Sequence, residues 1–195
     1  MKSPERNKKK EKLLDHGIEL ISEFGYHGTG LKKILDRVKV PKGSFYNYFE
    51  SKEHYVSEII QKYSEDLLSR IDNYLEATDD DPLTQIKSIY YTAIDEIGVK
   101  GSSGCLLGNL AAEIGSSSSL CQKSMNKAFY EWKNRFVKLI DYAQKEGLVR
   151  DDLTAELLSN IFWDTWEGSL LRMKIDVDID LRKNMDVMLD VLFKG

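Results

Sequence analysis

The stretch between residues 27 and 52 constrains the fold more than any other part of the chain. Apolar residues recur at helical spacing over residues 31–38, and Pro41 then interrupts the pattern because it pushes the preceding residue out of the α region. Pro41 suits the first position of a following short helix, in which Phe45 and Phe49 lie four residues apart on one face. The sequence therefore predicts two short helices joined by a tight turn.

Further helices are expected on both sides of this pair. An apolar stripe over residues 5–24 predicts a supporting helix, with Gly25 as its C-cap. Thr29 is placed to cap the first short helix, and Ser51 to cap a long helix that reaches about residue 77. The free N–H groups at the start of that long helix suit a phosphate, and Lys52 adds positive charge there.

The second short helix has an apolar underside and an outer face rich in hydrogen-bond donors. Such a helix can present side chains to base edges and phosphates. A helix-turn-helix is also a common packing corner with no role in DNA binding, so both interpretations stay open on spacing alone. The predicted DNA-binding residues are Lys42, Tyr46 and Asn47 as the main candidates, Thr29, Tyr48 and Lys52 on phosphates, and Gly43 and Ser44 beside them.

The distribution of charge favours a polyanionic partner for the N-terminal quarter only. The whole chain carries a net charge of −4, but residues 1–52 hold 12 Lys and Arg against 7 Asp and Glu, and the remainder is acidic. A basic end on an acidic body is typical of a protein that meets nucleic acid through one end. The basic residues at positions 1–10 form either a solvated end or an additional phosphate contact.

The string GYHGTGLKKILDRVKVPKGSFYNYFESKE resembles the N-terminal domain of the TetR family of bacterial repressors. The chain departs from the family pattern at Leu35, where a small residue is frequent, at Lys39, where glycine is frequent, and at Tyr55, where leucine is usual. Lys39 must then adopt a turn conformation that glycine adopts freely. The resemblance implies a homodimer that binds a palindromic operator, with two recognition helices about 35 Å apart in successive major grooves.

The rest of the chain predicts an all-α fold, with an N-terminal three-helix head over residues 1–50 and a helical effector-binding and dimerisation body over residues 51–195. The last two predicted helices are more apolar than one packed face requires, since Trp163, Leu171 and Val191 fall outside the main stripes. Two such helices from each chain would form a dimer interface, and burial within one chain is the alternative. Body helices are expected over residues 83–97, 105–115, 120–147, 153–173 and 179–192, with a flexible connector over residues 98–104.

Two further segments, GCLLGNLAAEIG and FWDTWEGSLLRMKID, resemble a TetR subgroup that responds to N-ethylmaleimide-like electrophiles or to acrylate. The resemblance implies that Cys105 is a sensing thiol and that Lys174 matches a lysine of that subgroup. A helix start favours the thiolate form of Cys105, although a free cysteine is also commonly a small buried hydrophobe. A reversible ligand pocket is the alternative, with Tyr90, Asn109, Tyr130, Trp163, Trp166 and Glu167 as its candidate lining.

Composition and residue spacing argue against a metalloprotein, a membrane protein and a secreted protein. The histidines are scattered and no CxxC motif is present, so we expect no metal site, no cofactor and no catalytic residue. No apolar run reaches the ~20 residues of a membrane span, and the N-terminus lacks the apolar region of a secretory signal, so a cytoplasmic protein is expected. The remaining alternatives are a helical ligand-binding or scaffold protein without DNA binding, and a cysteine-dependent enzyme using Cys105.

Overall fold

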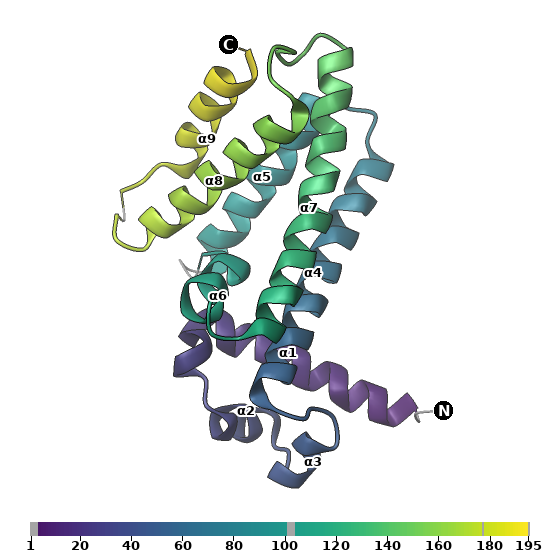
Figure 1. Ribbon diagram of the computed structural model, residues 1–195, viewed down its shortest axis with the longest axis vertical. Helices are drawn as coiled ribbons and strands as arrows, with labels where there is room; N and C mark the ends of the chain where they lie inside the picture. The colour runs from purple at the N-terminus through teal and green to yellow at the C-terminus, as the bar shows by residue number, and fades with distance from the viewer. Residues whose placement is uncertain (1–3, 101–103, 177, 195) are drawn as a thin grey trace. The chain divides into compact units, whose positions relative to one another are not determined.

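Every regular element is helical in the parts of the chain that the computed structural model describes, residues 4–100, 104–176 and 178–194 (Figure 1). The prediction of an all-α fold is therefore confirmed. None of the helices in these ranges combines the length and the apolar character that a membrane span requires. In chain order they are α1 (Pro4–Gly28), α2 (Leu31–Val38), α3 (Lys42–Tyr46), α4 (Lys52–Ala77), α5 (Pro82–Lys100), α6 (Leu106–Ile114), α7 (Ser119–Lys145), α8 (Ala155–Met173), α9 (Leu181–Leu189) and a π-helical turn, η1 (Asp190–Lys194).

The described residues pack into two compact units. The first unit contains the chain up to Leu67 together with Cys105–Ala128, and the second contains Leu68–Gly104 together with residues 129–195. Two long helices, α4 and α7, contribute to both units. This grouping describes packing, and the functional boundary expected between residues 50 and 51 stays a prediction.

The first unit has one hydrophobic core that joins the head to α6. Leu13, Ile34, Phe45 and Ile59 are completely buried in this core, and Leu110 of α6 is buried with them. Helix α6 lies against the end of α1 that leads into α2 (Figure 1). The sequence predicted the head from its first three helices, and the structure adds α6, which lies far from them in the chain.

The turn between α2 and α3 forms as the apolar spacing predicts, although its caps differ. Lys39 adopts the left-handed conformation (φ 56°, ψ 46°) that the family pattern indicated. The N-cap of α2 is Gly30 and not Thr29, because the Thr29 hydroxyl donates to the Leu20 carbonyl oxygen (3.1 Å) inside the core. Pro41 is the N-cap of α3 and not its first helical residue.

The second unit has an aromatic core centred on Tyr90 of α5. The Tyr90 ring makes edge-to-face contacts with the rings of Phe162 (4.3 Å between centroids) and Trp166 (4.8 Å) of α8. Such contacts are favourable beyond the burial of the rings themselves. Bidentate hydrogen bonds from Arg135 of α7 to Asp72 of α4 hold the pKa of that carboxyl below its ordinary value.

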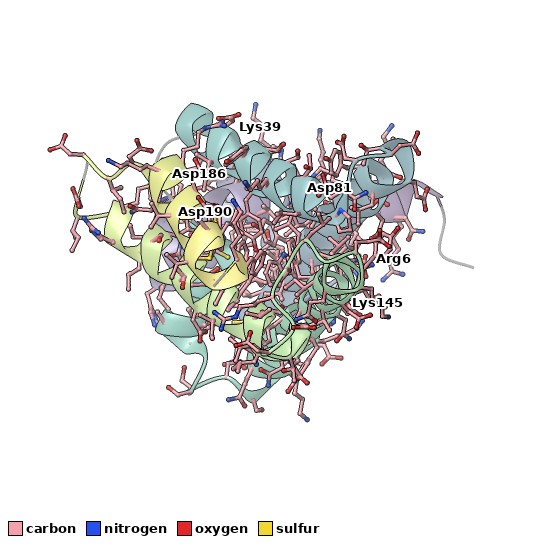
Figure 2. The ribbon with its side chains drawn as sticks, turned by 90° about the horizontal axis from the view of Figure 1, so that it is seen from above. Arg6, Lys39, Asp81, Lys145, Asp186 and Asp190 are labelled. Carbon is pink, nitrogen blue, oxygen red and sulfur yellow. The ribbon has the colours of Figure 1, made fainter. Side chains whose placement is uncertain are left out.

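Helices α5 and α9 of the second unit are joined by polar contacts near the C-terminal end of the chain. The Tyr91 hydroxyl donates to Asp186, and Arg182 pairs with Asp95. Asp186 and Asp190 lie on consecutive turns at the end of the chain (Figure 2), and Asp190 pairs with Lys194 (2.7 Å). The sequence predicted α5 to end at residue 97, but its helix continues to Lys100, and residues 101–103 of the expected connector lie outside the described residues.

Candidate DNA-binding surface and sensor helix

Two buried phenylalanines, Phe45 in α3 and Phe49 just after it, attach this helix to the core. Phe45 is 0% exposed and Phe49 1% exposed, and their rings contact each other (5.1 Å between centroids) and the buried Tyr55 ring of α4. The helix has only five residues and makes few hydrogen bonds of its own. Burial of these aromatic side chains therefore helps to hold α3 in place.

The outer side of α3 presents the side chains that the sequence predicted for DNA. Lys42, Gly43 and Asn47 are exposed, and Tyr46 retains 50% of its surface. Ser44 and Tyr48 are half-buried at the edges of this surface. The described structure thus gathers six of the eight predicted DNA-binding residues on one short helix and the turn after it.

Basic residues of α1 contact the recognition segment, a feature that sequence spacing did not reveal. The Arg6 guanidinium donates to the Asn47 carbonyl oxygen (2.8 Å), and its carbon lies 5.7 Å from the centroid of the Tyr48 ring. Lys10 pairs with Glu58 and lies 5.6 Å from the Phe49 ring centroid. Part of the basic N-terminal segment, expected to be solvated or on phosphates, therefore supports the end of α3.

Two predicted phosphate contacts have other roles in the structure. Thr29 is completely buried, and its backbone N–H is also bonded, to the Tyr26 carbonyl (3.4 Å). Its hydroxyl and its N–H are both engaged within the protein, and its contact with a phosphate stays a prediction. Lys52 is half-buried and its ammonium donates to the Tyr26 carbonyl oxygen (2.5 Å), while burial lowers the pKa of Lys52. Ser51 does cap α4 as predicted, because its hydroxyl accepts from the His54 N–H (3.0 Å).

The predicted sensor segment forms α6, with Cys105 as its N-cap. Cys105 is half-buried, and its carbonyl oxygen accepts the first helical hydrogen bond from the Asn109 N–H (3.0 Å). A helix N-terminus stabilises a thiolate, so the position suits a reactive cysteine. Cys121 is completely buried, and burial raises the pKa of its thiol. The two cysteines therefore differ in burial, and the role of Cys105 as a sensor stays a prediction. Asn109 is half-buried.

Four of the other predicted effector residues lie on or just after α8, in the second unit. Trp166 is 7% exposed in the aromatic core, and Trp163 is half-buried against the Trp132 ring (4.3 Å between centroids). Glu167 is half-buried, and Lys174 is exposed at the C-cap of α8. Tyr130, a candidate lining residue, is 56% exposed on α7, and its place in a ligand pocket stays a prediction. Because Cys105 belongs to the other unit, its pairing with Lys174 stays a prediction.

Comparison with known families identifies the family to which the chain belongs. Residues 13–59 match the model of the bacterial regulatory proteins of the tetR family, and residues 82–186 match that of the tetracyclin repressor-like C-terminal domain. The chain belongs to the TetR family. It is therefore a transcriptional regulator, and the curated relatives named below are repressors and not enzymes.

Two relatives of this TetR-family chain illustrate the extent of the similarity. The HTH-type transcriptional repressor DhaR of Mycobacterium sp. (strain GP1) is 33% identical over 186 residues, which cover 95% of this chain and 91% of DhaR. The HTH-type transcriptional repressor NemR of Escherichia coli (strain K12) is 28% identical over 180 residues, which cover 90% of this chain and 88% of NemR. The crystal structure of reduced E. coli NemR has the same fold, with a TM-score of 0.84 and 23% identity over 95% of each chain. The predicted resemblance to the NemR-like subgroup is confirmed.

The structure explains one departure from the TetR pattern. Tyr55 is completely buried, and its hydroxyl donates to the Leu13 carbonyl oxygen of α1 (2.6 Å). The hydroxyl occupies space that Gly17 leaves open, since a β-carbon at position 17 would collide with it. The large residue at position 55 and the glycine in the middle of α1 therefore form one packing unit.

Proposed function

We propose that this TetR-family regulator is a homodimeric repressor that binds a palindromic operator through α3. The observation that carries the proposal is the two-sided character of that helix. Phe45 and Phe49 are buried beneath it, while Lys42, Tyr46 and Asn47 are exposed above them. A firmly seated helix with polar side chains on its outer side can enter a major groove and read base edges.

The exposed residues of α3 differ in what they can recognise. An asparagine amide can bind adenine through two hydrogen bonds, and a lysine can donate to guanine or to a phosphate. Asn47 and Lys42 are therefore the candidates for reading the sequence, with Tyr46 beside them. We accordingly propose that the protein acts in the cytoplasm, where it would meet its operator. Footprinting on genomic fragments tests the assignment, and protection of a palindrome with half-sites one helical turn or a multiple of it apart is the expected result.

Helices α8 and α9 are proposed as the dimer interface. Leu171 is 66% exposed, Val187 55% and Val191, in the adjoining η1 turn, 68%, which leaves apolar side chains uncovered in the single chain. A second copy would cover them in an isologous interface, as the family's dimerisation suggests.

A charge on this surface should therefore separate the subunits. Leu171→Glu combined with Val191→Glu buries unpaired carboxylates in the proposed interface, so we expect a dissociation constant raised by roughly 100-fold or more. Light scattering after gel filtration measures the mass. Tyr142→Glu, at an exposed aromatic residue of α7 (54%), is the control and should stay dimeric. A dimer that survives both substitutions on α8 and η1 would place the interface elsewhere.

Cys105 is proposed as the sensor, on the basis of its position at the start of α6 and the resemblance to electrophile-responsive repressors. With N-ethylmaleimide as the probe, the thiolate sulfur forms a bond to one alkene carbon and the other alkene carbon takes a proton from water. No group leaves. The modified protein would bind operator less well than the free thiol form, so the electrophile shifts the population towards the DNA-free state.

Cys105→Ser tests this sensor directly. Wild type is expected to lose operator binding after treatment with N-ethylmaleimide, while the serine variant, which lacks a nucleophilic thiolate, stays bound. Cys121→Ser is the matched control, and it should respond like wild type because Cys121 is buried with a raised pKa. Release of wild type and the Cys105 variant alike, or of neither, would make the effector a reversible ligand.

A further inference from the structure

A carboxylate of α6 binds two consecutive backbone amides at the end of α1. Glu113 accepts from the Tyr26 N–H with one oxygen (3.1 Å) and from the His27 N–H with the other (3.0 Å). Hydrogen bonds to an ionised acceptor are about twice as strong as neutral ones. Both oxygens of one side chain therefore hold a segment that lies more than 80 residues away in the sequence.

The backbone of α1 is shaped for this contact. Gly25 has φ 69° and ψ 179°, which breaks the helix and presents the next two amides to Glu113. A β-carbon at position 25 would collide with the Glu113 carboxylate. Glycine is thus required at Gly25 both for its backbone conformation and for the close approach of α6.

The same segment is also held by α4. Lys52, the first residue of α4, donates to the Tyr26 carbonyl oxygen (2.5 Å), and its ammonium lies 3.8 Å from the centroid of the Tyr26 ring. The Glu113 charge opposes the lowering of the Lys52 pKa by burial, which indicates that the two charges act on each other. The peptide groups that lead into α2 are therefore bonded both to α6 and to α4.

We propose that Glu113 is a positioning residue for DNA binding, which fixes the start of the helix-turn-helix to α6 and thereby passes a change at Cys105 to α3. The proposal rests on the function proposed above. Cys105 and Glu113 belong to the same short helix, one at its N-cap and the other one residue before its C-terminal end. A displacement of α6 would move the carboxylate, and the amides of residues 26 and 27 would follow it or lose their acceptor. Either event changes the entry to α2.

The test compares Glu113→Gln and Glu113→Ala with Glu23→Gln, which removes the same charge from an exposed position on α1. A glutamine replaces one of the two acceptor oxygens with an NH2 group, a donor that faces a donor, and it removes the charge, so the paired hydrogen bonds to the two amides are lost in their present geometry. Hydrogen exchange of the peptide containing Tyr26 and His27 reports loss of the contact independently of DNA. Operator affinity is measured for the folded fraction, with and without N-ethylmaleimide.

For both Glu113 variants we expect faster exchange of that peptide, operator affinity lowered about tenfold, and a smaller ratio between the affinities with and without the electrophile. Glu23→Gln should behave as wild type. Faster exchange or a lower melting temperature with unchanged affinity and an unchanged ratio would show a merely structural contact and overturn the proposal. If wild type itself binds no operator, the proposed function fails instead. The exchange result would then still show whether Glu113 holds the amides of Tyr26 and His27.

Discussion

Replacing Gly17 with alanine is expected to destabilise the protein, although the same change inside a helix usually stabilises it by about 1 kcal/mol. A β-carbon at position 17 would collide with the Tyr55 hydroxyl and the end of the Ile59 side chain, both completely buried. Inserting a methyl group into a filled core costs about 1–3 kcal/mol, and here it also displaces the hydroxyl from the Leu13 carbonyl. Thermal unfolding should show a melting temperature lowered by about 2–4 °C for each kcal/mol lost.

A double-mutant cycle with Tyr55→Leu identifies the cause of that loss. Leucine removes the hydroxyl, so Gly17→Ala should cost much less in the Tyr55→Leu background than in wild type. Equal costs in the two backgrounds would show that the alanine acts through something other than the contact with Tyr55. Leucine is also the residue usual at this position in the TetR pattern, and it is therefore expected to be tolerated.

Asn47→Ala is expected to weaken operator binding by about 1–3 kcal/mol, roughly 5- to 150-fold, with little change in affinity for unrelated DNA. The side chain of Asn47 is exposed, while its backbone carbonyl accepts the Arg6 hydrogen bond and survives the substitution. The loss should therefore reflect base recognition and not a displaced α3. Fluorescence anisotropy on operator and scrambled duplexes measures both affinities.

Asn134→Ala is the matched control for this experiment, since Asn134 is an exposed asparagine of α7 in the second compact unit. It should bind both duplexes as wild type does. If Asn47→Ala weakened the two duplexes equally, Asn47 would contribute to phosphate contact or to folding, and the reading of bases would have to come from other residues of α3.

Much of the head could be predicted because its determinants are local. Apolar spacing indicated α2 and α3, and the proline placed the turn between them within one residue. Lys39 adopts the left-handed conformation that the comparison with the family pattern implied. The burial of Phe45 and Phe49 followed from their separation by one helical turn.

Several errors and omissions arise from contacts that helical spacing does not encode. Its place in the sequence predicted Thr29 as the cap of α2, but its hydroxyl donates to the carbonyl oxygen of Leu20, nine residues earlier, inside the core. The contacts of Arg6 with Asn47 and of Glu113 with Tyr26 join residues 41 and 87 positions apart, and no periodic pattern signals them. Their partners are backbone groups, which every residue carries, so the side chain alone gives no clue to its target.

Binding of the purified protein to genomic fragments, including the DNA upstream of its own gene, tests the central claim most directly. Titrations at low and at physiological salt, followed by footprinting, should show tight binding that weakens steeply with salt and protects a palindrome. Absence of any salt-sensitive affinity for duplex DNA would contradict the account. Such a result would favour a helical ligand-binding or scaffold protein that keeps the fold of a TetR regulator without its function.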